Sequence, residues 1–422
     1  MNIEEISEEE YNLFIKNYPD SLFFQSVEWA KYKEEFGWEK LIIGLKEDGK
    51  LLAAAILLGK DAPLLKKKMY YSPRGIIIDY NNYELIKKFT KLLKPFLKKH
   101  NALFLKMNPY IKYCERDIDG KVISDNKNEL INFLKKNGYK HYKMYIKAED
   151  KKELEPRWLS VLDIDNKTMD EVFKNMHQTT RWMINKSQKN YISVHEATDK
   201  DIPLFKKMMQ NTADRRNFED RPLIYYQKMF EVLGKSNMIK ILMADIDLKA
   251  LHQSIINDIN HLKERIEKVK DNPKKANQVN EFNSQISSIE NKLPDILEKI
   301  KKYGEKPYIA AGLYLFYGDQ VVYLYGCSYK EFMSFGAQYL MQYKVIEEAI
   351  DKKYKKFNFY GIDGDFRKES PNYGLFEFKR GFNANVVELI GEFDYPTNKF
   401  TYFIYTIMFK TYKFLKRLKR HK

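Results

Sequence analysis

The sequence predicts an α+β fold made of two domains and a projecting helical hairpin. Three observations carry this prediction. Helical and extended segments alternate over residues 1–150, and a similar order of segments returns from residue 151 onward. Two strand-like runs, 238–244 and 307–317, enclose a long stretch with helical periodicity. With 422 residues and 44% hydrophobic content, the chain is long enough to bury a core in each of two domains.

Residues 1–150 form the first predicted domain. Ser7 and Glu10 resemble a capping box at a helix start, and Asp48-Gly49 is typical of a hairpin turn. The closely spaced strands give this domain a mainly antiparallel character. Further helices are expected at 27–36, 83–100 and 130–137, and strands at 40–45, 51–58, 69–78 and 102–107.

The second predicted domain comprises 151–246 and 304–398. A basic helix is expected over 168–189, directly after Asp165-Asn166. The apolar patterns predict strands at 160–164, 192–195, 238–244, 307–317, 320–326 and 356–360, and further helices at 199–212, 225–233 and 336–352.

Residues 247–303 are expected to form an arm inserted in the second domain. Apolar residues recur at steps of three and four, which is the seam pattern of a coiled coil. A polar break at 271–275 that contains Pro273 predicts a turn, so the two helices form an antiparallel hairpin. A helix of about 22 residues is roughly 33 Å long. The seam residues are Leu248, Leu251, Ile255, Ile259, Leu262, Ile266 and Val269, then Val279, Phe282, Ile286, Ile289, Leu293, Ile296 and Ile300.

Composition limits the classes of function. The net charge of +16 favours nucleic acid, an anionic membrane or a phosphorylated substrate as partner, with a merely solubilising surface as the alternative. Cys114 and Cys327 are the only cysteines, which excludes a disulfide framework and indicates a reducing compartment. The acidic start and the missing long apolar run predict a cytoplasmic protein. The seven histidines lack ligand spacing, so we expect neither a metal nor a cofactor.

A turn at Ser334-Phe335-Gly336-Ala337-Gln338-Tyr339 opens the helix expected over 336–352. Backbone N–H groups at such a turn suit a pyrophosphate, so an acyl-CoA-dependent N-acyltransferase is one alternative function. Acyl-CoA acetyltransferases use a second glycine in this loop, and this sequence has none. An ordinary helix start is the competing interpretation.

Several short motifs, in order along the chain, together resemble the FemABX aminoacyltransferases. Each motif is weak alone, but the ordered set and the inserted arm cover residues from about 20 to 400. The motifs are Gln25-Ser26-Val27-Glu28-Trp29-Ala30-Lys31-Tyr32-Lys33, Leu105-Lys106-Met107-Asn108-Pro109-Tyr110, Ser160-Val161-Leu162-Asp163-Ile164, Arg215-Arg216-Asn217-Phe218-Glu219-Asp220-Arg221, Asn358-Phe359-Tyr360-Gly361-Ile362, Phe378-Lys379-Arg380-Gly381-Phe382 and Glu388-Leu389-Ile390-Gly391-Glu392-Phe393.

The resemblance implies two acetyltransferase-like (GNAT-like) domains and a coiled-coil arm. It also implies transfer of Gly, Ala or Ser from aminoacyl-tRNA to the stem-peptide amine of a lipid-linked peptidoglycan precursor of the lipid II type, which builds the cross-bridge. Homologous aminoacyltransferases are further expected partners, and the expected location is the inner face of the cell membrane. A non-catalytic RNA-binding protein that uses the arm and the basic surface is the alternative from another class.

The resemblance also assigns site residues. Lys33, Arg221, Tyr225, Tyr325, Phe378 and Lys379 fall at precursor-binding positions, with Tyr323 a weaker candidate. Lys379 is expected to stabilise negative charge during the reaction. Some relatives have Asp where this chain has Asn108, and because an amide is no general base, Asn108 is expected only to orient substrate. Arg181 and Lys186, on the basic helix, are expected to contact the tRNA backbone by charge.

The tail, 399–422, predicts a basic amphipathic helix. It has no acidic residue, and its apolar residues recur near helical spacing among Lys and Arg. This pattern favours a helix in the interface of an anionic membrane. A terminal helix packed on the protein is the alternative.

Overall fold

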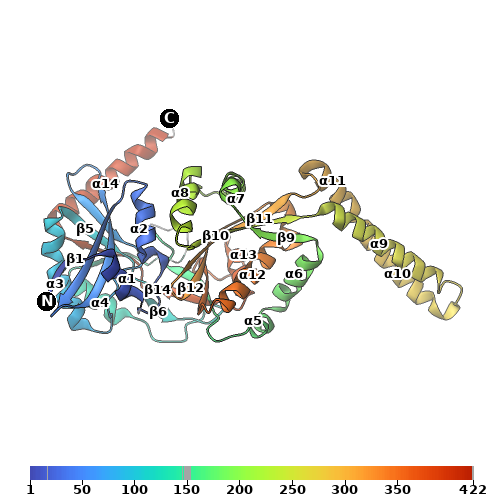
Figure 1. Ribbon diagram of the computed structural model, residues 1–422, viewed down its shortest axis with the longest axis horizontal. Helices are drawn as coiled ribbons and strands as arrows, with labels where there is room; N and C mark the ends of the chain where they lie inside the picture. Colours follow the sequence, from blue (N-terminus) through green and yellow to red (C-terminus); the bar gives the residue numbers. More distant parts are fainter. Residues whose placement is uncertain (17, 145, 147–153, 421–422) are drawn as a thin grey trace.

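The computed structural model describes residues 1–16, 18–144, 146 and 154–420. These residues form two mixed β-sheets with helices on both faces (Figure 1). A helical arm projects from the second sheet, and helix α14 (Lys399–Arg420) leaves the molecule on the side of the first sheet, far from the arm. An α+β fold is therefore confirmed.

Within the described ranges, the first sheet has seven strands in the order β1-β2-β3-β4-β5-β15-β7. The neighbours β4 and β5 are parallel, and the other pairs are antiparallel. The strands are β1 (Asn2–Glu5), β2 (Glu39–Glu47), β3 (Lys50–Asp61), β4 (Lys68–Ser72), β5 (Ala102–Met107), β7 (Lys140–His141) and β15 (Phe393–Pro396).

Alternate residues of this sheet serve two cores, because successive side chains of a strand point to opposite faces. Ile43 packs with α3 (Tyr83–Lys99) and α4 (Asn128–Lys136), whereas Ile42 packs with α1 (Glu8–Lys16) and α2 (Val27–Glu34). The start of α1 is capped as expected, since the backbone N–H of Glu10 donates to Ser7 Oγ at 3.1 Å.

The second sheet, counted over the same described residues, has eight strands in the order β6-β14-β8-β13-β12-β11-β10-β9. Helices α5 (Met169–Asn175), α6 (Gln178–Lys189) and α12 (Ala337–Asp351) cover one face, and α7 (Ile202–Arg216) and α8 (Leu223–Gly234) cover the other. The strands are β6 (Lys112–Glu115), β8 (Trp158–Asp163), β9 (Ile192–Glu196), β10 (Ile239–Ile246), β11 (Tyr308–Tyr317), β12 (Gln320–Ser328), β13 (Lys356–Gly361) and β14 (Asn385–Leu389).

Two strands cross the expected domain boundary. Strand β6 comes from the first 150 residues but pairs with β14 in the second sheet. Strand β15 follows β14 along the chain but pairs with β5 in the first sheet. The two halves therefore exchange strands, which ties the sheets together.

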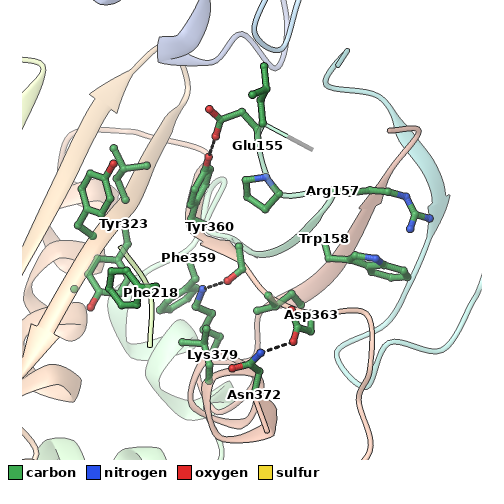
Figure 2. Close-up of a pocket in the computed structure, with 18 of the residues that line it drawn as sticks. Glu155, Arg157, Trp158, Phe218, Tyr323, Phe359, Tyr360, Asp363, Asn372 and Lys379 are labelled. Atoms are coloured by element: carbon green, nitrogen blue, oxygen red, sulfur yellow. Dashed lines mark hydrogen bonds between the residues drawn. The ribbon is translucent and has the colours of Figure 1, made fainter. Parts of the chain in front are cut away.

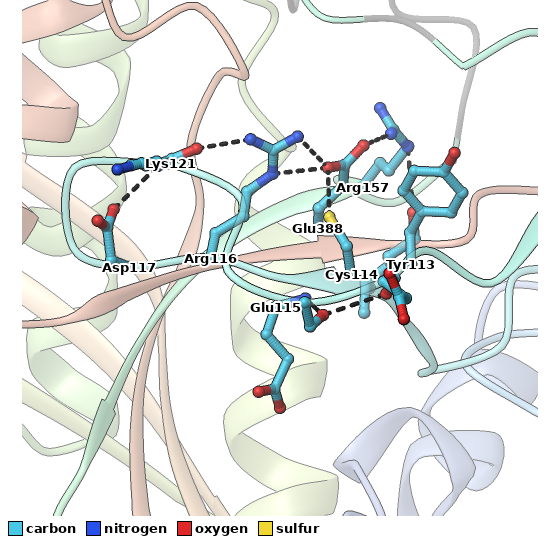
Figure 3. Close-up of polar contacts among 12 residues, drawn as sticks. Tyr113, Cys114, Glu115, Arg116, Asp117, Lys121, Arg157 and Glu388 are labelled. Atoms are coloured by element: carbon cyan, nitrogen blue, oxygen red, sulfur yellow. Dashed lines mark hydrogen bonds and ion pairs between the residues drawn. The ribbon is translucent and has the colours of Figure 1, made fainter.

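A buried ion cluster holds the β6–β14–β8 edge (Figure 3). The carboxylate of Glu388 on β14 accepts from Arg157 and from Arg116, whose Nε lies 2.7 Å away. Cys114 Sγ on β6 also donates to it, at 3.3 Å. Burial raises the pKa of the Cys114 thiol. This cysteine is a packing residue rather than a reactive thiol.

The arm is helical and turns near Pro273, as expected, but its second leg is broken. Helix α9 (Leu248–Glu267) packs against α10 (Ala276–Glu290) and α11 (Leu293–Tyr303). The sequence pattern predicted one continuous second helix. Pro294 explains the break, because its ring has no N–H and clashes with the carbonyl four residues back, at Glu290, where α10 ends. Supercoiling of the arm stays a prediction.

Two other expected elements differ. The basic helix over 168–189 is split, because Met176 has an extended backbone (φ −67°, ψ 152°) between α5 and α6. The strand expected at 69–78 ends at Ser72, before Pro73. The missed elements are short: β1, β6, β7, β14, β15 and α13 (Tyr373–Arg380).

Candidate active site

A cavity of about 540 Å³ opens where two parallel strands separate. Strands β12 and β13 pair over Gln320–Val322 and Lys356–Asn358. The residues that follow, 323–326 on β12 and 359–361 on β13, line the cavity. Helix α2 of the first half and α8 and α13 of the second supply the other walls. The cavity therefore lies at the junction of the two halves.

Backbone irregularities in β12 and β13 determine which way the tyrosine side chains of these strands point. A bulge beside Leu313 in the β11–β12 ladder shifts the register at Leu324, so Tyr323 packs on the α12 side and Tyr325 on the α8 side. Strict alternation would have put these two rings on one face. On β13, Tyr360 has φ +65°, and its N–H donates to Asn358 Oδ1 at 2.9 Å. Left-handed backbone at a bulky residue costs free energy, which the surrounding packing must offset.

One wall of the cavity is cationic and aromatic. Lys33 Nζ lies 4.5 Å from the ring centroid of Trp29 and 5.2 Å from that of Tyr225. The Arg221 guanidinium lies 5.3 Å from the Tyr225 ring. Of the residues predicted to bind precursor, Lys33, Arg221, Tyr225 and Tyr325 thus line one cavity. Two positive charges at one opening suit a polyanion.

Lys379 is a further basic residue of the cavity, apart from Lys33 and Arg221. It lies on α13, is 4% exposed, and its Nζ donates to the carbonyl of Gly361 at 2.6 Å (Figure 2). Burial lowers the pKa of the Lys379 ammonium to about 7, because the charged form loses hydration. This amine therefore changes charge within the physiological range.

Two carboxylates that sequence reasoning missed line the same cavity. Glu155 accepts a hydrogen bond from the hydroxyl of Tyr360, and Asp363 Oδ2 accepts from the Asn372 amide at 2.6 Å (Figure 2). Burial raises the pKa of the Tyr360 phenol well above its ordinary value, so this phenol stays a donor. No local motif signals Glu155, because its partner is 205 positions away.

Asn108 and Phe378 do not line the cavity. Asn108 is 2% exposed, and its Oδ1 accepts from the N–H of Arg74 at 2.9 Å. Arg74 Nη2 in turn donates to the carbonyl of Pro156 at 2.6 Å, beside Glu155. Phe378 packs edge-on against Tyr339, with ring centroids 4.9 Å apart. Asn108 thus acts on the cavity wall through Arg74, and Phe378 supports the helix that carries Lys379.

The residues expected to contact tRNA lie on α6, outside the cavity. Arg181 Nη1 donates to the carbonyl of Lys174 at 2.7 Å, and Lys186 Nζ donates to that of Ser334 at 3.0 Å. Trp182 is 56% exposed between them, with Lys186 Nζ 4.8 Å from its ring centroid. An exposed aromatic ring on a basic helix is a further feature that suits nucleic acid.

The turn before α12 is closely packed. Gly336 has φ +85°, and a Cβ there would lie 3.1 Å from the carbonyl oxygen of Met183 on α6. The helix opens at Ala337, as the sequence predicts. Lys186 and Asn190 both donate to carbonyls of this turn. Helix α6 therefore packs against this turn.

Comparison with known proteins identifies the family. The FemAB family model matches residues 6–410. Aminoacyltransferase FemA proteins of Staphylococcus aureus are 30% identical over 417 residues, which cover 97% of this chain and 99% of theirs. A crystal structure of FemX is 27% identical with a TM-score of 0.75, covering 96% of this chain and 99% of that one. The chain therefore belongs to the FemAB family and is an aminoacyltransferase.

Proposed function

We propose that this enzyme moves Gly, Ala or Ser from aminoacyl-tRNA to the stem-peptide amine of a lipid-linked peptidoglycan precursor. The product is an extended cross-bridge, and the acceptor is met at the inner face of the cell membrane. The observation that best supports this proposal is that one cavity is lined by a pair of cations, a buried lysine with a lowered pKa and two carboxylates. Those groups match the diphosphate, the reacting ester and the amine of such a substrate pair.

The cationic wall is the proposed diphosphate site. Lys33 and Arg221 are held over the Tyr225 ring at 5.2 and 5.3 Å, so their positions are fixed before substrate arrives. Arginine can bind a phosphate through two parallel N–H groups, and lysine adds a compact charge. Pre-positioned charges reduce the entropy lost on binding. Tyr225 and Tyr325 add ring surface beside the sugars.

The reaction is proposed to run on the carboxylate side. The acceptor nitrogen attacks the ester carbon of the aminoacyl-tRNA, and the bond from that carbon to the ribose oxygen breaks. Glu155 is the candidate group to take the proton that the nitrogen loses and to return that proton to the departing ribose oxygen, which leaves as a hydroxyl. Charged Lys379 stabilises the oxyanion of the tetrahedral intermediate. Asn108 acts only indirectly, by holding Arg74 against the Pro156 carbonyl next to Glu155.

Helix α6 is the proposed tRNA surface. It carries Arg181, Lys186 and Lys189 and no acidic residue. Arg181 and Lys186 suit phosphate groups by charge. The exposed ring of Trp182 suits stacking on an unpaired base, which an acceptor end of tRNA provides.

The acetyltransferase-like character of both halves stays part of this proposal. Strands β12 and β13, which separate beside a bulge and are followed by helices, support it for the second half. The acyl-CoA alternative is disfavoured, because the turn before α12 has Gly336 alone and lacks the second glycine that acyl-CoA acetyltransferases use.

The deciding experiment is mass spectrometry of lipid-linked precursor after incubation with the protein and each of three purified aminoacyl-tRNAs, charged with Gly, Ala or Ser. A mass gain of one or more residues on the stem peptide, dependent on the charged tRNA, supports the proposal. Parallel reactions contain acetyl-CoA and a small amine in place of tRNA and precursor. Transfer only from acetyl-CoA would favour the alternative, and tRNA binding without any product would favour an RNA-binding protein.

A further inference from the structure

The outer face of α14 carries an apolar stripe that no other part of the described chain covers. Its members occupy positions i, i+3, i+4, i+7, i+8 and i+12, so they share one side of the helix. From Phe400 to Tyr412 the stripe runs about 18 Å. The stripe residues and their exposed fractions are Phe400 72%, Phe403 60%, Ile404 39%, Ile407 51%, Met408 37% and Tyr412 40%.

The opposite face of α14 fixes the helix to the protein. Tyr402 and Tyr405 are 5% and 3% exposed. Both rings contact Phe104 on β5, at centroid distances of 5.3 and 6.2 Å. The hydroxyl of Tyr402 donates to Asp394. The two alternatives for the tail therefore combine: one face packs on the first sheet, and the stripe faces outward.

The charge of α14 is entirely positive. Residues 399–422 contain no Asp or Glu, and Lys399 and Lys410 are exposed. The sequence beyond the stripe keeps the same apolar spacing with Phe414, Leu415 and Leu418, among Lys413, Lys416, Arg417, Lys419 and Arg420. Apolar and cationic residues in this combination bind acyl chains and anionic headgroups together.

We propose that α14 lies flat in the interface of an anionic bilayer, with the stripe inserted among the acyl chains. Among the described residues, no helix is both long and apolar enough to cross a membrane. A second copy of the chain is the less suitable occupant, because two helices of the same positive charge would repel. The inference deepens the proposed function, since a lipid-linked acceptor lies at a bilayer, but vesicle binding can be tested without any transfer reaction.

The test is flotation of the full-length protein with vesicles of phosphatidylglycerol and phosphatidylcholine, compared with phosphatidylcholine alone. Removal of the whole tail would also delete the buried rings of Tyr402 and Tyr405, so point variants are better. The stripe variant carries Phe403→Ser and Ile407→Ser. We expect the wild type to float with anionic vesicles and the stripe variant to bind at least about ten-fold more weakly.

The matched control carries Leu13→Ser and Ile123→Ser, which remove two apolar side chains that are 69% and 61% exposed elsewhere. It should float like the wild type. Equal binding of the stripe variant and the wild type would overturn the inference, as would a wild-type protein that ignores anionic vesicles. The inference would also be overturned if light scattering showed that the stripe substitutions convert a dimer into a monomer while flotation stayed unchanged. Vesicle binding by a protein that transfers no amino acid would refute the proposed function and leave this inference standing.

Discussion

At the scale of residues, replacing Lys33 tests whether this lysine binds the precursor or is only a surface charge. Lys33→Ala should raise the KM for precursor by roughly 10- to 100-fold, because a charge-assisted contact to phosphate contributes about 1.5–3 kcal/mol. Steady-state kinetics at fixed aminoacyl-tRNA measures this. Lys31→Ala is the control, since Lys31 lies on the same helix but pairs with Glu8 at the surface. If Lys33→Ala and Lys31→Ala had equal kinetics, the proposed diphosphate site would be wrong.

Lys379 should make the pH profile of kcat/KM fall on its basic side, which we call the falling limb. With a pKa of about 7, the ammonium is charged below that pH and neutral above it. If the charge stabilises the oxyanion, kcat/KM should fall as pH rises through about 7. Lys379→Arg keeps its charge, so the falling limb should disappear even if the rate is lower. An unchanged limb in Lys379→Arg would assign it to another group.

The same burial predicts a trade-off between stability and function at Lys379. In the unfolded chain a lysine has its ordinary pKa, so between about pH 7 and 10 the unfolded state binds more protons and stability rises with pH. Lys379→Met removes the penalty of this buried amine and should stabilise the fold at pH 8 by on the order of 3 kcal/mol while transfer is lost. Urea unfolding at that pH measures the difference.

Glu155 is the residue whose replacement tests the chemistry. Glu155→Gln keeps the shape and an acceptor for Tyr360 but cannot take a proton. The expected loss in kcat is roughly 100-fold or more, in the range found for general bases. Rapid-quench measurement of the transfer step gives the value. Asp363→Asn is the comparison within the cavity, and a larger loss there than at Glu155 would reverse the assignment.

At the scale of elements, the buried Glu388 carboxylate stabilises the β6–β14–β8 edge. Glu388→Gln removes the charge of the carboxylate that accepts from Arg157 and Arg116, and Arg157 is only 5% exposed. Breaking a buried ion pair on one side costs about 3–5 kcal/mol. Denaturant unfolding should show a loss of that order. Glu115→Gln, on the same edge but paired with Lys112 at the surface, should change stability by less than about 1 kcal/mol.

At the scale of the whole molecule, the arm is separable from the precursor site. The residues that line the cavity lie outside 248–303, and the arm rejoins the sheet where the N–H of Leu248 donates to the carbonyl of Glu305 at 2.8 Å. Replacing 250–303 by a short Gly-Ser linker should leave the affinity for precursor within about two-fold, because no contacting group is removed. Calorimetry measures this. A loss of precursor binding in a folded variant would make the arm part of the site.

Sequence by itself determined the α+β class, the two halves, the inserted arm and the amphipathic tail, because each depends on local periodicity. Steps of three and four placed the arm helices, and the apolar run 51–58 after the Asp48-Gly49 turn placed β3. It also named Lys33, Arg221, Tyr225 and Tyr325, but only through resemblance to a family. Pro294 was visible in the sequence, yet the apolar seam continued past it and hid the break.

Tertiary structure alone decided which distant groups meet. Strands β6 and β15 join sheets on the far side of the expected boundary, since long-range pairing leaves no local pattern in strands of four residues. Glu155 and Tyr360 are joined across 205 positions. The left-handed backbone of Tyr360 lies where the register between β13 and β8 shifts, between Asn358 and Gly361, and alternation does not reveal this shift. The pKa of Lys379 has the same origin, because desolvation depends on everything packed around the amine. Periodicity fixes how each segment is built, whereas burial, register and charge at the site arise only when segments far apart in the chain pack together.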